Sequence, residues 1–227
     1  MKRVILFDID GTLVRGGPAK EAFHGAMLET YGTAGDVDGV SFAGKTDLQI
    51  ARELLLGVGF DTARIEDGFP DLWHRYTTSL QERLVDEPVT VLAGVSELLD
   101  ALAGIDDVGV ALLTGNIARG AELKLGSGGL MRHFSFGSYG SDHEERDELP
   151  AIALDRARAE WGSSIRAQDA VVVGDTPRDV QCGQHGGTRT LGVATGSFSA
   201  SQLRDAGADS VVEDLSDTAD VVSFLTL

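Results

Sequence analysis

Two aspartates near the start of the chain, Asp8 and Asp10, have the type and spacing needed for acid chemistry beside a bound cation. They follow residues 4–7, an apolar run typical of a strand that is buried on both faces. Since side chains alternate along an extended strand, both carboxylates should project to the same side. Neighbouring negative charges repel, and a bound cation is the simplest group that would stabilise them. The pair therefore indicates a cation site, although an Asp-Gly turn alone would explain the same residues.

Polar residues also follow two later apolar runs. One run ends in Thr114, Gly115 and Asn116, and the other, which is rich in valine, ends in Asp175. Continuous apolar runs separated by helical patterns predict a parallel sheet that is covered on both faces. Ligands of such sheets bind outside the carboxyl ends of the strands. We therefore expect these polar groups to meet the two N-terminal aspartates at one edge of the sheet.

The spacing of apolar residues divides the chain into two regions. Residues 17–87 show one helical pattern after another, whereas strands and helices alternate from residue 88 onward. The expected fold class is α/β, a doubly wound parallel-sheet (Rossmann-like) core with an inserted α-helical cap domain. The core would comprise residues 1–16 and 88–227, and the cap residues 17–87. Strands are expected at residues 4–7, 108–113, 134–136, 170–174, 188–193 and 210–212.

The segment after the valine-rich strand has two interpretations. Thr176 can cap the next helix, with Asp179 three residues later, as in a capping box. This capping leaves the carboxyl group of Asp175 unexplained. Mg²⁺ takes oxygen ligands, usually one or two carboxylates with water and substrate phosphate, so a magnesium site would account for it. Thr114 and Asn116 likewise suit either a helix cap or an anion site at a helix start.

The composition limits the classes of partner. The 227 residues carry 19 Lys and Arg against 36 Asp and Glu, which gives a net charge of −17. A chain this acidic is repelled by nucleic acid and by anionic membrane surfaces, so we expect it to bind neither. No apolar run approaches the ~20 residues of a membrane span, and the single Cys182 suits a reducing compartment. We expect a cytoplasmic protein whose oligomeric state is left open, with a monomer as one candidate.

Three segments together resemble motifs of the haloacid dehalogenase-like hydrolase superfamily, in particular its phosphoglycolate-phosphatase branch with a helical cap. They are residues 8–12 for the first motif, 113–116 for the second and 174–179 for the fourth. The resemblance implies that Asp8 is a nucleophile that forms an aspartyl-phosphate. It implies that Asp10 protonates the leaving alcohol and then activates water, a role for which we expect a raised pKa.

The resemblance also implies how phosphate and metal are held. The transferred phosphoryl group would be bound by Thr114 with its neighbours Gly115 and Asn116. Mg²⁺ would be the cofactor, held by the two N-terminal aspartates, by Asp175 directly and by Asp179 through water or by orientation. For Asp10 the proposed ligand is the backbone carbonyl.

Members of the superfamily also place a basic residue between the second and fourth motifs. The cation at the matching position is Arg146, just ahead of a helix, where lysine is the commoner form. Lys124 is the competitor, and its position inside the preceding helix favours a structural role. In the cap, Lys45 and Thr46 belong to a segment similar to the substrate loop of the phosphoglycolate-phosphatase and phosphoglucomutase branches. Lys45 could meet a substrate anion there, or it could simply be solvated.

The resemblance implies a Mg²⁺-dependent phosphatase that acts on a small phosphorylated metabolite. A phosphomutase of the β-phosphoglucomutase type, which uses the same aspartate pair, is the first alternative. A phosphoaccepting signalling module of the receiver type is a second, less favoured because of the chain length and the large insert. Dehalogenase activity is disfavoured by the acid at Asp10, and phosphonate hydrolysis would need a cap lysine, Lys20 or Lys45, that forms a Schiff base.

Overall fold

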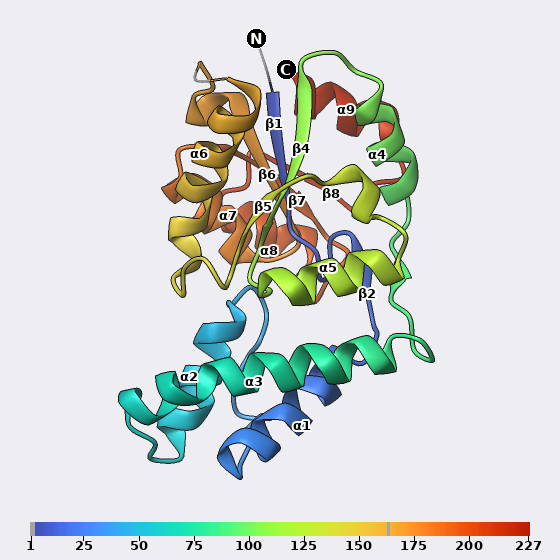
Figure 1. Cartoon of the computed structure of the whole chain (residues 1–227). Coiled ribbons are helices and arrows are strands. Elements are labelled where there is room, and N and C mark those ends of the chain that lie inside the picture. The colour runs from blue at the N-terminus through green and yellow to red at the C-terminus, as the bar shows by residue number, and fades with distance from the viewer. Residues whose placement is uncertain (1–2, 163) are drawn as a thin grey trace.

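The computed structural model of the protein describes residues 3–162 and 164–227, and a six-stranded parallel sheet forms its centre (Figure 1). The strand order is β5-β4-β1-β6-β7-β8, so the strand that carries the first motif lies in the middle. This confirms the predicted doubly wound α/β fold. The strands of this sheet are β1 (Arg3–Phe7), β4 (Val108–Thr114), β5 (Gly137–Tyr139), β6 (Ala170–Gly174), β7 (Arg189–Val193) and β8 (Ser210–Val212).

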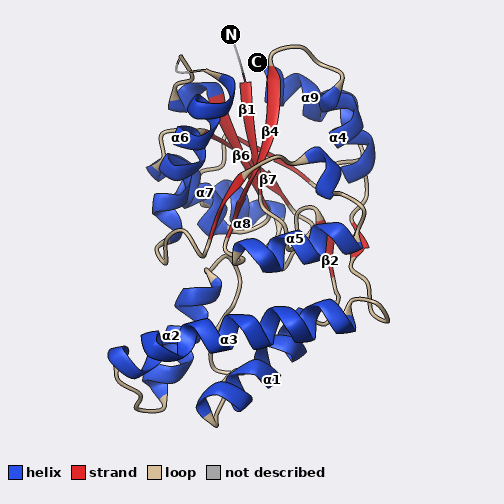
Figure 2. Ribbon diagram, viewed as in Figure 1, coloured by secondary structure: helices blue, strands red, loops and turns tan. Residues whose placement is uncertain are grey.

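Helices cover both faces of the sheet (Figure 2). Alternate residues of β1 enter two separate cores, Val4 and Leu6 one and Ile5 and Phe7 the other. Residues of α6 and α7 belong to the first core. Residues of α4, α5 and α9 belong to the second, which also includes apolar residues of the helical insert. The apolar run of β1 is continuous because both of its faces are buried. These helices, with α8, are α4 (Val95–Ala103), α5 (Ala118–Ser127), α6 (Leu149–Trp161), α7 (Pro177–His185), α8 (Ala200–Asp205) and α9 (Thr218–Thr226).

Three further helices form a separate group beyond the carboxyl ends of the strands (Figure 1). They are α1 (Ala19–Tyr31), α2 (Asp47–Gly57) and α3 (Thr62–Arg83). Asp61 caps α3 by accepting a hydrogen bond from the N–H of Arg64 at 2.9 Å, and the helix begins at Thr62. It continues through Pro70. We call this group the cap helices.

A two-stranded antiparallel ribbon lies at the two boundaries expected between core and cap, and the sequence did not predict it. It pairs β2 (Val14–Arg15) with β3 (Thr90–Val91). The two chain crossings are therefore joined to each other by backbone hydrogen bonds. The division at residues 16 and 88 itself stays a prediction.

One expected strand is displaced. Residues 134–136 lie outside the sheet, between the short 3₁₀ helix η1 (Met131–His133) and β5. The two aromatic residues that suggested a strand pack instead against other rings, Phe134 against Phe7 and Phe136 against Trp161, with centroids 6.2 and 4.8 Å apart. The strand then starts at Gly137, where a Cβ atom would lie 2.5 Å from that of Leu112. The remaining short helices are η2 (Arg146–Glu148) and η3 (Ala167–Asp169).

In the part of the chain that the structure describes, no helix is both long enough and apolar enough to cross a membrane.

Candidate active site

The end of β1 places Asp8 in the middle of the sheet edge. Its N–H continues the ladder by donating to the carbonyl of Val173 on β6, at 2.9 Å, and its side chain is buried. Asp10 lies in the turn that follows, and half of its side chain is exposed. Both aspartates line one cavity, as the alternation of side chains predicted. Their surroundings nevertheless differ, because each is held by a different cation.

Asp175 lies at the end of β6 and is buried beside two glycines. Its Oδ1 accepts a hydrogen bond from the hydroxyl of Thr12 at 3.2 Å. A Cβ atom at Gly11, which has a φ of +85°, would lie 2.4 Å from the carboxylate of Asp175, and one at Gly196 would lie 1.7 Å from it. The two loops can approach this carboxylate only because both residues lack side chains.

Arg146 provides the cation that contacts Asp8. Its Nη2 donates to Oδ1 of Asp8 at 3.0 Å and also to Oδ1 of Asp179. The thiol of Cys182 donates to the backbone carbonyl of Arg146 at 3.3 Å and so fixes the chain from below. Burial would lower the pKa of the guanidinium, but Asp179 and Asp8 raise it above its ordinary value. The side chain is therefore a permanent buried cation.

Asp179 both caps α7 and forms an ion pair with Arg146 in the site. Its Oδ2 accepts from the N–H of Thr176 at 2.9 Å and from the Thr176 hydroxyl at 2.7 Å, and its own N–H donates back to that hydroxyl. The predicted capping box is confirmed. A Cβ atom at Gly174 would lie 2.2 Å from Cγ of Asp179, so the strand must end in glycine for the carboxylate to fit.

Asp8, Asp175 and Asp179 form one buried cluster, with a carboxylate oxygen from each within 4.8 Å of the others. Burial raises the pKa of Asp8 to about 7 against the opposing charge of Arg146, and the other acids add to the rise. Burial, with Asp179 and Asp8, raises the pKa of Asp175 to about 8. Arg146 forms ion pairs with Asp8 and Asp179, whereas Asp175 has no ion pair among the described residues. Such a set of oxygen ligands fits Mg²⁺.

A second network surrounds Asp10 at the end of β4. The Nδ2 of Asn116 donates to Oδ2 of Asp10 at 2.7 Å and to the hydroxyl of Thr114 at 2.9 Å. The Nζ of Lys124 donates to both carboxylate oxygens of Asp10, at 2.9 and 2.7 Å, and to Oδ1 of Asn116 at 2.7 Å. The lysine side chain is almost completely buried. Its ammonium group is therefore part of the site.

Lys124 was expected to be structural, as the less favoured competitor of Arg146, but its ammonium group contacts Asp10 in the cavity. It lies on the buried face of α5 with Ala121 and Leu125, three residues after the one and one residue before the other. A lysine among apolar residues on the buried stripe of a helix needs a buried partner, and this is the signal that could have identified it.

The expectation of a raised pKa for Asp10 is wrong for this arrangement. Burial alone would raise the pKa of Asp10. The charge of Lys124 and the hydrogen bonds from Lys124 and Asn116 outweigh burial and hold the pKa below its usual value. Asp10 is consequently a carboxylate in the structure, whereas its neighbour Asp8 binds a proton more readily.

The cap loop before α2 reaches the site with Lys45 but not with Thr46. Lys45 lines the cavity, although its ammonium is paired with the carboxylate of Glu53. Thr46 is fully buried: its hydroxyl donates to the carbonyl of Glu144 at 2.7 Å and accepts from the N–H of Gln49 at 3.1 Å, as the cap of α2. Thr46 thus positions the loop.

Asp47 joins the same cap loop to the loop after β4. Its N–H donates to the carbonyl of Gly115, and its Oδ2 accepts from the N–H of Ile117, both at 2.8 Å. A Cβ atom at Gly115 would lie 2.1 Å from the carbonyl oxygen of Lys45, so only glycine permits this approach. Burial raises the pKa of Asp47 to about 6, although Lys124 opposes the rise.

The cap loop and cap helices close the site into a cavity of about 400 Å³. This volume is near the lower end of the range for small-molecule sites, roughly 300–1,000 Å³. The floor of the cavity holds the two polar networks, including Asp8, Asp10, Thr114, Lys124, Arg146 and Asp175. The opposite wall comes from the cap and includes Lys20, Phe23, Phe42, Asp47, Ile50 and Tyr76.

The two buried cations should contribute unequally to stability, which Arg146→Met and Lys124→Met can test because both variants keep an apolar stem. Loss of Arg146 strands the buried Asp8 and Asp179, and removing one partner of a buried ion pair typically costs about 3–5 kcal/mol. Loss of Lys124 leaves Asp10, whose side chain is half exposed and stays hydrated, so the cost should be smaller. Urea unfolding of metal-free protein at neutral pH measures both. An equal or larger loss for Lys124→Met would contradict the assignment of the pairs.

Comparisons with known proteins agree with this fold. Three solved structures match almost the whole length of both chains. A predicted phosphoglycolate phosphatase from Haemophilus somnus has 19% identity, covers 97% of this chain and 98% of its own, and has a TM-score of 0.71. A hydrolase from Pseudomonas syringae has 18% identity, complete coverage of both chains and a TM-score of 0.70. CbbY from Rhodobacter sphaeroides, in complex with phosphate, has 19% identity, 96% coverage of each chain and a TM-score of 0.63.

These structural matches establish the shared fold. The search of curated proteins found no match. The family model for haloacid dehalogenase-like hydrolases matches residues 5–193, which span every motif of the site from Asp8 to Asp179. The chain therefore belongs to the haloacid dehalogenase-like hydrolase family.

Proposed function

We propose that the protein is a magnesium-dependent phosphatase that hydrolyses a small phosphorylated metabolite through an aspartyl-phosphate on Asp8. One observation carries the proposal: a buried carboxylate, Asp8, faces a small cavity in a cluster of three acids whose charge Arg146 balances only in part. Family membership and the phosphate bound by the Rhodobacter sphaeroides relative support phosphoryl chemistry. The acidic character of the chain makes the local cations necessary for an anionic substrate.

Asp8 is held in a way that suits attack on phosphorus. Arg146 donates to Oδ1, which leaves Oδ2 as the attacking atom. The new bond joins Oδ2 to phosphorus while the bond from phosphorus to the leaving oxygen breaks. Water then attacks the phosphorus of the aspartyl-phosphate, which releases phosphate and restores the carboxylate. The guanidinium stays beside Asp8 throughout and offsets charge on the phosphoryl oxygens.

Asp10 acts as a general acid in the first step and as a general base in the second. In the structure it is a carboxylate, which suits the second step, where it accepts a proton from the attacking water. In the first step the leaving oxygen needs a proton. An arriving phosphate dianion would raise the pKa of Asp10 by repulsion, and this favours the protonated acid. Lys124 and Asn116 fix the direction of the carboxylate in either state.

The end of β4 supplies the phosphate contacts. The hydroxyl of Thr114 already accepts hydrogen bonds from the N–H and the Nδ2 of Asn116. Its own proton therefore remains to be donated to a phosphoryl oxygen. Gly115 and Asn116 follow in the loop that leads to α5. The loop and Arg146 would hold the phosphoryl group from two sides.

Mg²⁺ would be held by Asp8, the backbone carbonyl of Asp10 and Asp175, and would offset the charge on the phosphoryl oxygens. Asp175 has one carboxylate oxygen bonded to Thr12 and one left for the metal. Both oxygens of Asp179 are engaged by Arg146 and Thr176. Asp179 therefore suits a contact through water, or a role in orienting Arg146.

The crowded acids predict an unusual pH dependence for metal-free protein. Between the unfolded-state pKa of 3.8 and the folded-state values of about 7 for Asp8 and about 8 for Asp175, the folded protein binds more protons than the unfolded chain. The unfolding free energy should therefore fall as pH rises through this range, by up to ~1.4 kcal/mol per pH unit for each proton. Thermal unfolding in chelator from pH 5 to 8 measures the decline, and adding Mg²⁺ at pH 8 should reverse it.

Asp175→Asn removes one of the repelling charges, so its metal-free Tm at pH 8 should exceed that of the wild type and respond less to Mg²⁺. Asp155→Asn is the matched control, since Asp155 is an exposed acid paired with Arg158 on α6. A wild-type Tm at pH 8 that does not change with Mg²⁺ would exclude the cluster as a metal site.

The two N-terminal aspartates should fail differently in assays of phosphate release. Asp8→Asn removes the nucleophile and should reduce turnover to a trace. Asp10→Asn keeps the backbone carbonyl and should retain its magnesium dependence, with a rate lower by about 10²–10⁴-fold. Both rates are measured with a panel of phosphate monoesters, with and without Mg²⁺.

Substantial release by Asp8→Asn would refute the covalent mechanism. Loss of the magnesium dependence in Asp10→Asn would show that the side chain of Asp10 binds the metal. An isomeric sugar phosphate as the wild-type product, in place of free phosphate, would identify a phosphomutase.

A further inference from the structure

The cap wall of the cavity contains a buried tyrosine whose hydroxyl is unpaired among the residues that the structure describes. Tyr76 on α3 is 2% exposed and lines the cavity. In the described part of the chain its hydroxyl takes part in no hydrogen bond. A buried phenol normally finds a partner, because leaving its hydroxyl unpaired costs free energy. A ligand in the cavity would supply one.

The ring of Tyr76 is fixed before any ligand binds. Phe23 of α1 packs edge-on against it, with centroids 5.7 Å apart and planes at 88°. On the other side lies the backbone of α5: a Cβ atom at Gly120 would be in ordinary van der Waals contact with the ring, 3.5 Å from Cε1 of Tyr76. Helices of both cap and core thus hold the ring. A hydroxyl positioned in this way can select a ligand at little cost in ordering.

The other polar groups of the cap wall are either satisfied or in solvent. Lys45 is paired with Glu53, and Lys20 is exposed beside the ring of Phe42, 5.9 Å from its centroid. Asp47 is the exception, because Oδ2 accepts from Ile117 while Oδ1 takes part in no hydrogen bond in the described residues.

Two residues that line the same cavity can therefore form hydrogen bonds with a hydroxyl of a ligand. Tyr76 can donate or accept, and Asp47 can accept. The rest of the wall is apolar, from Phe23, Phe42 and Ile50, and would contact a carbon chain. An unsubstituted alkyl group would leave both polar groups unpaired, whereas a hydroxyl would satisfy them. At the position of Asp47, a second phosphate or a carboxylate would be repelled by the charge of that residue.

We propose that the substrate is a phosphate monoester of a small polyhydroxylated compound, and that Tyr76 recognises a hydroxyl of its leaving group. This rests on the proposed function, because it concerns the part of the ester that departs from phosphorus. Tyr76 is on this account a specificity-determining residue. The cavity volume agrees with a compound of a few carbon atoms.

The test compares two esters that differ only in hydroxyl groups, glycerol phosphate and propyl phosphate, on purified full-length protein with Mg²⁺. The wild type should show a higher kcat/KM for glycerol phosphate. Tyr76→Phe removes one oxygen atom and should lower the ratio of the two kcat/KM values about 3- to 10-fold.

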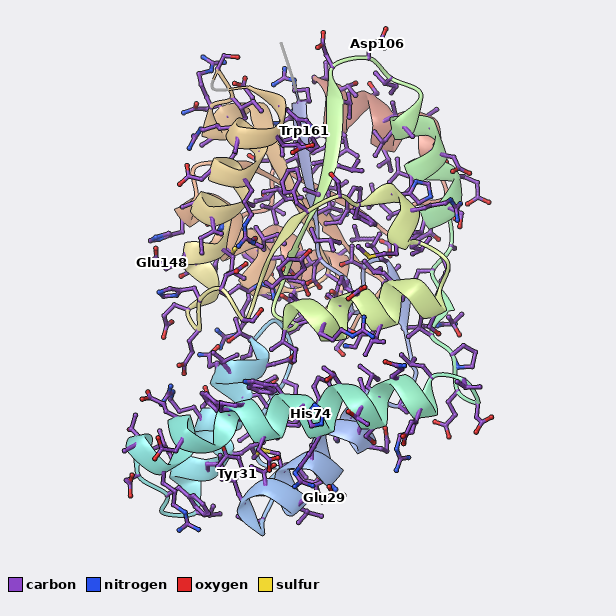
Figure 3. All side chains as sticks on the ribbon, in the orientation of Figure 1. Glu29, Tyr31, His74, Asp106, Glu148 and Trp161 are labelled. Carbon is purple, nitrogen blue, oxygen red and sulfur yellow. The ribbon has the colours of Figure 1, made fainter. Side chains whose placement is uncertain are left out.

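Tyr31→Phe is the matched control within the cap helices (Figure 3). The hydroxyl of Tyr31 donates to the carbonyl of Ile65 at 2.6 Å, so its loss should lower the Tm and leave the ratio unchanged. A ratio in Tyr76→Phe equal to that of the wild type, or a wild type that prefers propyl phosphate, overturns the inference while the phosphatase stands. If the wild type releases phosphate from neither ester nor from any other monoester, the proposed function fails and the inference falls with it.

Discussion

Three carboxylates buried beside a single guanidinium are the constraint on which the site depends. Asp8 and Asp175 are placed by the ends of adjacent strands, and Asp179 by the capping box of the helix that follows. Burial raises the pKa of the first two, since Arg146 balances only part of their charge. The fold therefore maintains a local excess of negative charge, which a bound cation would balance.

Two different cations contact the carboxylates of the site. Arg146 pairs with Asp8 and Asp179 of the buried cluster. Lys124 pairs with Asp10, and its Nζ lies less than 3 Å from both carboxylate oxygens. The two aspartates of one motif thereby acquire opposite pKa shifts, which is the usual way in which one site assigns different roles to like groups. Asp47 connects this arrangement to the cap, because it is bonded to the loop between Thr114 and α5.

The sequence predicted the parts of the site that are local to strand ends. Asp8, Thr114 and Asp175 each follow a continuous apolar run, and parallel strands bring their carboxyl ends together. Lys124 was considered but assigned a structural role, because its partner Asp10 is 114 positions away and only the fold brings the two together. The pKa of Asp10 was mistaken for the same reason. Thr46 was proposed as a substrate contact, yet it caps a helix; its local sequence suits both roles.

The central claim is that Asp8 becomes phosphorylated during turnover. The most direct measurement is an acid quench of enzyme mixed with a reactive phosphate monoester, followed by mass analysis of its peptides. The account predicts one phosphoryl group on the peptide that contains Asp8, present during turnover, absent once substrate is exhausted, and absent from Asp8→Asn. A phosphoryl group on another residue, or phosphate release with no labelled peptide at any quench time, would contradict it.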